Sequence, residues 1–370
     1  MPEIDLKGFT HKTLSTKPYD LTYSYYTSPD FQSKTQQRPD IPILVFSHGY
    51  PDNAQMWAGA MPHMLQQPYP MLLLDILGLG FSSKTKEAKH YNYKQQADSI
   101  AQILDAEGIT GPERVIPIGH DWGSAISQRF YLYHRHRCAG LIINSLAYQI
   151  PSSEPFDLDA ANLSTAGRFG YPQWEYWNFF CAPDAPKLMD EDLTRMWEVN
   201  NGLYRSNIPE EHGRDVWMRE MFCTLGAMRE YVAREGKYKD FTVELKPYAK
   251  NPELKNRFLE RMKTDSFSAP VNYYHSLKNN TMLDDERALL ALKTENGEDP
   301  RVISKPMLYI GQTGDWVCRT DLMSDAKEQG LVPDLEEKVL DAGHWFLYEV
   351  PQEFAETIAT WLGKRFPVKK

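Results

Sequence analysis

The chain has 370 residues, of which 42% are hydrophobic and 25% charged, a balance typical of a globular protein with a large buried core. Its net charge of -9 at pH 7 comes without a cluster of basic residues, so nucleic acid and anionic membranes are not expected partners. The sequence contains no run of about 18 apolar residues, and no basic segment followed by an apolar stretch opens it, which predicts a cytoplasmic chain without a signal peptide or membrane span.

The spacing of the cysteines and the absence of glycine-rich nucleotide-binding motifs argue against several cofactors. The four cysteines are widely separated and form no CxxC pair, so neither a disulfide framework nor a zinc site is expected. Neither GxxxxGK[ST] nor GxGxxG occurs, so the sequence predicts no nucleotide cofactor.

The first part of the chain alternates short apolar segments with segments of helical spacing. An alternating pattern at 21–26 predicts an antiparallel strand, and the polar segment 28–40 predicts a loop. Further strands are expected at 41–46, 71–75, 115–118 and 139–144. Helices are expected at 93–107 and 124–134. Such alternation predicts a mostly parallel sheet with crossover helices.

The second part changes character at about Pro151, where Trp, Tyr, Met and charged residues become frequent. No convincing buried strand follows until 306–310, so we expect residues 149–298 to form a helical insertion. The core domain is then built from 1–148 and 299–370. Its last elements are expected to be a helix at 321–329, a strand at 337–340 and a helix at 351–364.

A Gly-His-Asp-Trp-Gly motif, Gly119 to Gly123, directly follows the predicted strand 115–118. Glycines in this arrangement permit the sharp strand-to-helix turn that presents a nucleophile, usually serine. Serine attacking a saturated carbon would leave an ether, whereas aspartate leaves an ester that water can cleave. Asp121 therefore indicates substitution at an sp³ carbon, with epoxides and alkyl halides as the leading substrates.

A histidine and a second carboxylate follow later strands. His344 lies just beyond the strand 337–340, and Asp315 follows the strand 306–310. The order nucleophile, acid, histidine is the order that α/β-hydrolases use. We therefore predict an α/β-hydrolase core in which Asp315 orients His344, the base that serves the nucleophile Asp121.

The turn after the strand 41–46 is the expected source of a backbone donor. It reads Ser47-His48-Gly49-Tyr50-Pro51, and the N–H groups of Tyr50 and Trp122 would together form an oxyanion hole. A Tyr-Pro bond in such a turn is also able to adopt the cis form.

These motifs resemble the soluble epoxide hydrolases, from about residue 20 to residue 362. The resemblance rests on His48 to Pro51, which fit His-Gly-x-Pro, and on His120 to Gly123, which fit His-Asp-Trp-Gly. It implies two cap tyrosines that activate the epoxide oxygen. Segments 176–183 and 271–274 resemble the two cap motifs and give Tyr176 and Tyr274. Other tyrosines of this aromatic-rich segment compete for these roles, namely Tyr171, Tyr204 and Tyr273.

The resemblance implies hydrolysis of a small apolar or aryl epoxide to a vicinal diol, through an ester on Asp121 and without a metal or organic cofactor. A dehalogenase with the same nucleophile is the nearest alternative. Haloalkane dehalogenases usually have Asn where this chain has Tyr50, and fluoroacetate dehalogenases have Arg where it has Trp122; both differences favour the epoxide. A third hypothesis is that the chain is a receptor that binds a small ligand and has a hydrolase fold.

Overall fold

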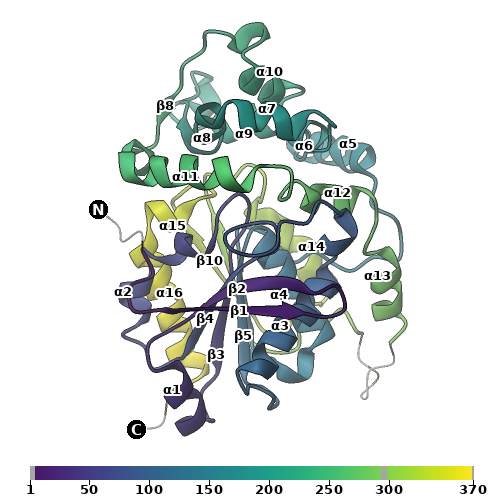
Figure 1. Cartoon of the computed structure of the whole chain (residues 1–370). Coiled ribbons are helices and arrows are strands. Elements are labelled where there is room, and N and C mark those ends of the chain that lie inside the picture. Colours follow the sequence, from purple (N-terminus) through teal and green to yellow (C-terminus); the bar gives the residue numbers. More distant parts are fainter. Residues whose placement is uncertain (1–4, 293–296, 298, 369–370) are drawn as a thin grey trace.

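An eight-stranded sheet forms the centre of the computed structural model, which describes residues 5–292, 297 and 299–368 (Figure 1). The strand order is β1-β2-β4-β3-β5-β6-β9-β10. The pairs β1–β2 and β2–β4 are antiparallel, and the others are parallel. The strands are β1 Thr10–Thr16, β2 Leu21–Thr27, β3 Ile43–Ser47, β4 Met71–Asp75, β5 Val115–His120, β6 Leu141–Asn144, β9 Met307–Gln312 and β10 Leu335–Leu340. The predicted mostly parallel sheet is confirmed.

Helices cover both faces of this sheet, so β3, β4, β5, β6 and β9 are buried along their whole length. Burial on both faces explains why these strands read as continuous apolar runs. One face packs against α3 and α4, and the other against α2 and α16. The core helices are α1 Phe31–Gln37, α2 Met61–Met64, α3 Tyr93–Ala106, α4 Trp122–Tyr133, α14 Met323–Glu328, α15 Phe346–Glu349 and α16 Pro351–Arg365.

Two local predictions at the N-terminal side were wrong or incomplete. The segment 28–40, predicted as a loop, contains helix α1. Its polar sequence hid the two anchors Phe31 and Thr35, which are buried one helical turn apart. Strand β1 was not predicted, because most of its residues are exposed at the sheet edge and show little apolar alternation.

Between β6 and β9 the chain forms a separate layer of helices across one end of the sheet (Figure 1). The layer contains α5 Leu158–Phe169, α6 Tyr176–Phe180, α7 Ala185–Glu191, α8 Leu193–Asn201, α9 Trp217–Phe222, α10 Ala227–Ala233, α11 Pro252–Asp265, α12 Asn272–Lys278 and α13 Leu283–Leu290. A small antiparallel sheet that the sequence did not predict, formed by β7 Gly202–Leu203 and β8 Glu244–Leu245, lies among them. The ring of Tyr274 in α12 lies 5.1 Å from that of Trp122, which follows β5. The layer therefore covers the carboxyl ends of the parallel strands.

The division of the chain into a core, 1–148 and 299–370, and a cap, 149–298, stays a prediction. Its second boundary, residue 298, lies outside the described residues. In the part of the chain that the structure describes, no helix is both long and apolar enough to cross a membrane.

Candidate active site

Asp121 stands at the tight turn between β5 and α4, with φ 53° and ψ -123°. A positive φ is costly for a residue with a side chain, and such strain concentrates at functional sites. The flanking glycines permit the turn: a Cβ on Gly119 would lie 2.3 Å from the carbonyl oxygen of Gly123, and one on Gly123 would lie 2.0 Å from that of Ser47. The sequence therefore holds the Asp121 carboxylate at the end of the sheet beneath the helical layer.

Backbone N–H groups converge on the Asp121 carboxylate. The N–H of Tyr50 donates to Oδ1 at 2.9 Å, and Gly49 permits this approach because a Cβ there would lie 2.4 Å from the Cβ of Asp121. The Tyr50–Pro51 bond is cis. Burial raises the pKa of the carboxyl, while His344 and the N–H groups of Trp122 and Tyr50 act in the opposite direction. The two predicted backbone donors thus meet at the same carboxylate.

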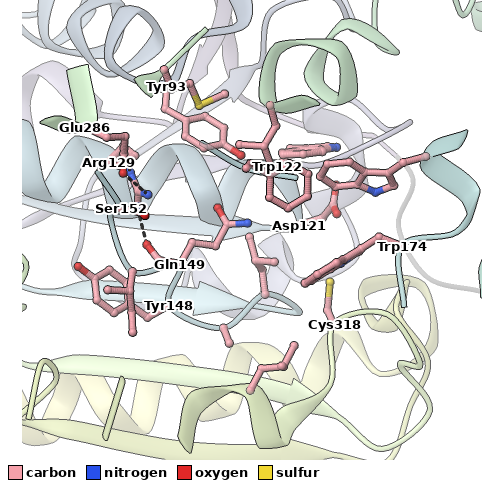
Figure 2. A pocket seen from close by; sticks show the side chains of 18 of the residues that line it. Tyr93, Asp121, Trp122, Arg129, Tyr148, Gln149, Ser152, Trp174, Glu286 and Cys318 are labelled. Atoms are coloured by element: carbon pink, nitrogen blue, oxygen red, sulfur yellow. Dashed lines mark hydrogen bonds and ion pairs between the residues drawn. The ribbon is translucent and has the colours of Figure 1, made fainter. Parts of the chain in front are cut away.

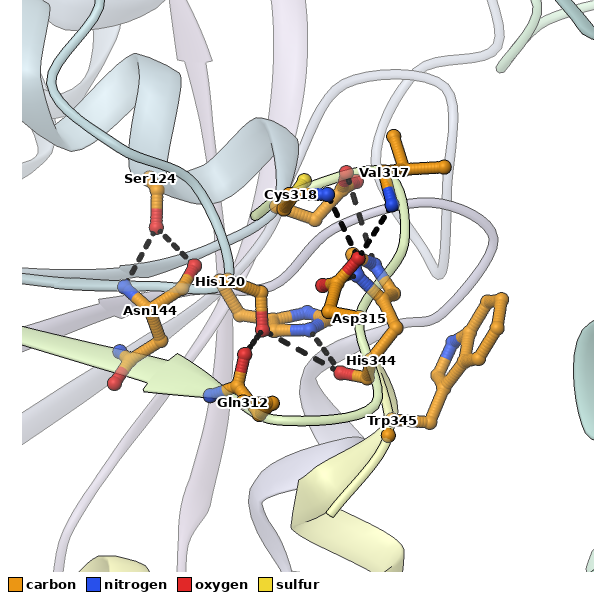
Figure 3. A network of polar contacts seen from close by, with 12 residues as sticks. His120, Ser124, Asn144, Gln312, Asp315, Val317, Cys318, His344 and Trp345 are labelled. Carbon is orange, nitrogen blue, oxygen red and sulfur yellow. Dashed lines mark hydrogen bonds and ion pairs between the residues drawn. The ribbon is translucent and has the colours of Figure 1, made fainter. Parts of the chain in front are cut away.

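The side chain of His344 lies between the carboxylates of Asp315, which Figure 3 shows beside it, and Asp121. Its Nδ1 is 2.6 Å from Oδ2 of Asp315, and its Nε2 is 3.8 Å from Oδ2 of Asp121. The buried Asp315 is fixed in turn, because its Oδ1 accepts hydrogen bonds from the N–H groups of Val317 and Cys318 at 3.0 and 2.7 Å. With the Nδ1 proton directed at Asp315, Nε2 is available as a base.

The charges around His344 favour its protonated form. Burial lowers its pKa, but Asp315 and Asp121 outweigh this effect and raise it overall. The neighbouring His120 donates from Nε2 to the carbonyl oxygen of His344 at 3.0 Å, and burial and the His344 charge hold its own pKa well below the usual value. His120 therefore stays neutral and supports the backbone that carries His344.

The two predicted cap tyrosines lie together near Asp121. Tyr176 in α6 and Tyr274 in α12 are buried, with ring centroids 5.6 Å apart. Burial and, to a smaller extent, the charge of Asp121 raise the pKa of both hydroxyls well above the usual value. Both side chains therefore remain protonated and able to donate a hydrogen bond.

The competing tyrosines are placed differently. The hydroxyl of Tyr273 has two acceptors within hydrogen-bonding distance, Oε1 of Gln96 at 2.8 Å and the carbonyl oxygen of Leu77 at 3.1 Å. The hydroxyl of Tyr171 donates to the carbonyl oxygen of Trp316 at 3.0 Å. Tyr204 is 42% exposed. These placements favour Tyr176 and Tyr274 over the other three tyrosines as the pair that activates the epoxide oxygen.

A cavity of about 390 Å³ opens beside Asp121 (Figure 2). Aromatic side chains form much of its wall, among them Trp122, Trp174, Tyr176 and Trp177. Tyr274 is not among the lining residues but packs against the rings of Trp122 and Tyr176. The cavity has the size and apolar character of a site for a small organic molecule.

Sequence reasoning missed a polar part of the cavity wall, formed by Tyr93, Arg129 and Glu286. Arg129 donates to both carboxylate oxygens of Glu286, at 2.7 and 3.0 Å, and the pair is buried. One signal in the sequence could have indicated it. Arg129 lies seven residues after Trp122, so in a helix the two side chains share one face, and this face packs inward.

Two of the three potential metal ligands of the site are already hydrogen-bonded to each other. Among the described residues, Asp315, Cys318 and His344 form a group whose ligand atoms lie within 4.8 Å. Asp315 is hydrogen-bonded to His344, and burial raises the pKa of the Cys318 thiol well above its usual value. The group therefore fits a carboxylate–histidine pair better than a cation site, which requires a thiolate and a free carboxylate.

Comparison with known proteins agrees with this geometry. A family model described as the alpha/beta hydrolase fold matches residues 42–176. Epoxide hydrolase B of Mycobacterium tuberculosis is 22% identical over 346 residues, covering 87% of this chain and 91% of the relative. Epoxide hydrolase srdG of Neurospora crassa is 24% identical over 360 residues, covering 95% of each chain. The solved structure of an epoxide hydrolase from an endophytic Streptomyces has a TM-score of 0.71 and 21% identity, covering 98% of each chain.

The predicted α/β-hydrolase fold and the predicted resemblance to epoxide hydrolases are therefore confirmed. The curated relatives also support the prediction that the chain is a hydrolase.

Proposed function

We propose that this protein hydrolyses epoxides to vicinal diols. The observation that carries the proposal is the position of the Asp121 carboxylate, which has the N–H of Tyr50 on Oδ1 and faces Nε2 of His344 through Oδ2. The names of the curated relatives support the same activity. In this proposal Asp121 is the nucleophile, His344 the base and Asp315 the residue that orients it.

Ring opening is the first step. The hydroxyls of Tyr176 and Tyr274 donate to the epoxide oxygen, while the carboxylate of Asp121 attacks a ring carbon from the opposite side. The C–O bond of the ring breaks, an alkyl ester forms on Asp121, and the alkoxide takes a proton from a tyrosine. The tyrosines are needed because an alkoxide is a poor leaving group without such donors.

Hydrolysis of the ester is the second step. His344 takes a proton from water, and the hydroxide attacks the ester carbonyl. The oxyanion that forms is stabilised by the N–H groups of Tyr50 and Trp122. Its collapse breaks the ester C–O bond, and the departing diol oxygen takes the proton held by His344. The second proton of the water passes to the tyrosinate left by ring opening, which restores both the tyrosine and the Asp121 carboxylate. Ester formation removes the negative charge of Asp121, which is one cause of the raised pKa of His344. The imidazole is therefore more often neutral at the stage that needs a base.

The proposed substrates are small apolar or aryl epoxides. Aromatic rings dominate the cavity wall near Asp121, and flat apolar groups pack well against such rings. Water is the second substrate, and no step of the mechanism needs a metal or an organic cofactor.

Hydrolytic dehalogenation is a second candidate, favoured by one observation. The indole N–H groups of Trp122 and Trp177 are buried without a hydrogen-bond partner in the described part of the chain. The two rings lie 5.7 Å apart beside Asp121. Such donors suit a departing halide, which leaves without protonation. The two protonated tyrosines favour the epoxide, whose oxygen must be protonated.

Product analysis separates these candidates, and it is run with wild type and Asp121→Asn. Asparagine is chosen because it tolerates a positive φ and so keeps the turn intact. Diol formation from aryl and alkyl epoxides is measured beside halide release from matched haloalkanes and fluoroacetate. Diol formation that disappears in the variant supports the proposal. Halide release alone would transfer the assignment to dehalogenation. Saturable binding of epoxides without turnover would support the hypothesis that the protein is a small-ligand receptor.

The tyrosines are tested by replacing each hydroxyl. Tyr176→Phe and Tyr274→Phe are each expected to slow ring opening about 10- to 100-fold, the effect of losing one hydrogen bond to the developing alkoxide, and to leave ester hydrolysis largely intact. Tyr273→Phe is the matched control, since its hydroxyl is bonded to Leu77 and Gln96. Rapid-quench measurement of ester formation gives the rate of the first step. Wild-type ring opening in either variant would remove that tyrosine from the mechanism.

A further inference from the structure

The cavity beside Asp121 changes from apolar to polar along helix α4. Trp122 and Arg129 both line it and lie seven residues apart, which corresponds to two helical turns and about 10 Å of helix. Tyr93 of α3 lies between them: its ring centroid is 6.2 Å from that of Trp122 and 5.8 Å from the guanidinium carbon of Arg129. Figure 2 shows this order, with Tyr93 and Arg129 on the side of the cavity away from Trp174.

The hydroxyl of Tyr93 has no hydrogen-bond partner in the part of the chain that the structure describes, although the side chain is only 2% exposed. Burial raises its pKa far above the usual value, so the hydroxyl keeps its proton. An unpaired buried hydroxyl costs stability. Its cost is offset when a ligand in the cavity supplies an acceptor.

The charged residues of this wall neutralise each other. Arg129 donates to both oxygens of Glu286 and to the carbonyl oxygen of Gln149. These bonds use three of the five N–H donors of a guanidinium group. The wall therefore offers hydrogen-bond donors without a net positive charge.

We propose that this wall, formed by Tyr93, Arg129, Gln149 and Glu286, is a subsite for an uncharged oxygen acceptor carried by the substrate at a distance from its epoxide ring. The inference rests on the proposed epoxide hydrolysis and narrows its substrate class to epoxides that also bear a carbonyl or ether oxygen. A carboxylate is disfavoured, because Glu286 and Asp121 both carry negative charge and the charge of Arg129 is already paired.

Binding of unreactive ligands tests the subsite without any turnover. The probes are 2-decanone, the hydrocarbon 2-methyl-1-decene, which has the same shape without the acceptor, and decanoate. Binding is followed by the fluorescence of the tryptophans that line the cavity, Trp122, Trp174 and Trp177. One hydrogen bond predicts that the ketone binds about five- to tenfold more tightly than the hydrocarbon, and more tightly than decanoate.

The variant Tyr93→Phe assigns the effect to the hydroxyl. It is expected to reduce the preference for ketone over hydrocarbon to about onefold to twofold, whereas the control Tyr23→Phe, at a buried tyrosine of β2 that does not line the cavity, keeps the wild-type preference. An unchanged preference in Tyr93→Phe overturns the proposal, and so does a wild type that binds decanoate most tightly or does not distinguish ketone from hydrocarbon.

Turnover then separates the subsite from the chemistry. Epoxides that carry a distant methyl ketone are compared with matched epoxyalkanes in wild type and Tyr93→Phe. The subsite predicts a higher kcat/KM for the keto-epoxides, and this advantage should disappear in the variant. If wild type turned over neither epoxide series, epoxide hydrolysis would be contradicted. The proposed subsite would then still be tested separately, by the binding measurements with the unreactive ligands.

Discussion

Asp315→Asn is expected to stop the second step of catalysis while sparing the first. Oδ1 of Asp315 accepts the N–H groups of Val317 and Cys318, so the asparagine oxygen can keep these two bonds. Its NH₂ group then faces Nδ1 of His344. Nδ1 of the histidine must then accept a hydrogen bond from this group, so the ring carries its proton on Nε2. A base needs a free lone pair on Nε2, and the variant lacks it.

The size of the effect follows from the lost charge. The Nδ1–Oδ2 distance is 2.6 Å, so the two charge centres lie roughly 4 Å apart when His344 is protonated. At an effective dielectric constant of about 20 this attraction amounts to about 4 kcal/mol. Its loss slows ester hydrolysis about 1,000-fold, and the wrong tautomer adds to the loss. Attack by Asp121 needs no proton transfer to His344 and should change far less.

The assay is rapid-quench mass spectrometry of the protein after mixing with epoxide. The variant should accumulate a covalent adduct of the mass of the substrate on the peptide that contains Asp121, and diol should appear slowly. Asp341→Asn is the control, because this exposed carboxylate lies three residues from His344 and accepts a hydrogen bond from Thr313. Wild-type turnover in Asp315→Asn, or loss of turnover without an adduct, would refute the reasoning.

Three further predictions concern the turn, the buried ion pair and the nucleophile. Gly123→Ala should lower the free energy of unfolding in urea by about 3 kcal/mol or more, because the new Cβ would lie 2.0 Å from the carbonyl oxygen of Ser47. Glu286→Gln should cost about 3 kcal/mol in the same assay, since it leaves Arg129 buried without its counter-charge. The pH profile of kcat/KM should rise through the raised pKa of Asp121, because only the ionised carboxylate attacks, with a midpoint above about 3.9, the usual aspartate value.

Each prediction has its contrary result. Gly167→Ala in α5, where no atom lies within 4 Å of the new Cβ, should not destabilise the protein, and an equal loss at both glycines would contradict the steric argument. Asp325→Asn breaks the exposed pair with Arg168 and should cost less than about 1 kcal/mol; a similar cost for Glu286→Gln would mean that burial does not matter there. An acid limb at or below pH 3.9 would contradict a desolvated Asp121.

The candidate catalytic residues could be predicted from the sequence because each motif is local. Gly119 to Gly123 form one tight turn directly after a strand, and Asp315 and His344 follow later strands of the same parallel sheet. Carboxyl ends of parallel strands share one edge, so chain order alone brings these side chains together. Their roles in catalysis stay predictions.

The polar wall of the cavity was not accessible in the same way. Tyr93 and Arg129 lie on different helices, and Glu286 comes from the helical layer. Helical periodicity shows which face of each helix is buried but not which residues of another helix meet it. Helix α1 was missed for a related reason, since only its tertiary contacts distinguish it from a polar loop.

The origin of the oxygen in the diol tests the central claim most directly. A single turnover is run in H₂¹⁸O with enzyme in excess over epoxide. An ester on Asp121 predicts that the first diol contains no ¹⁸O and that the label appears in the carboxylate of Asp121, because the diol oxygen comes from the aspartate and water replaces it. Diol that carries ¹⁸O in the first turnover, with unlabelled Asp121, would show direct attack by water and contradict the account.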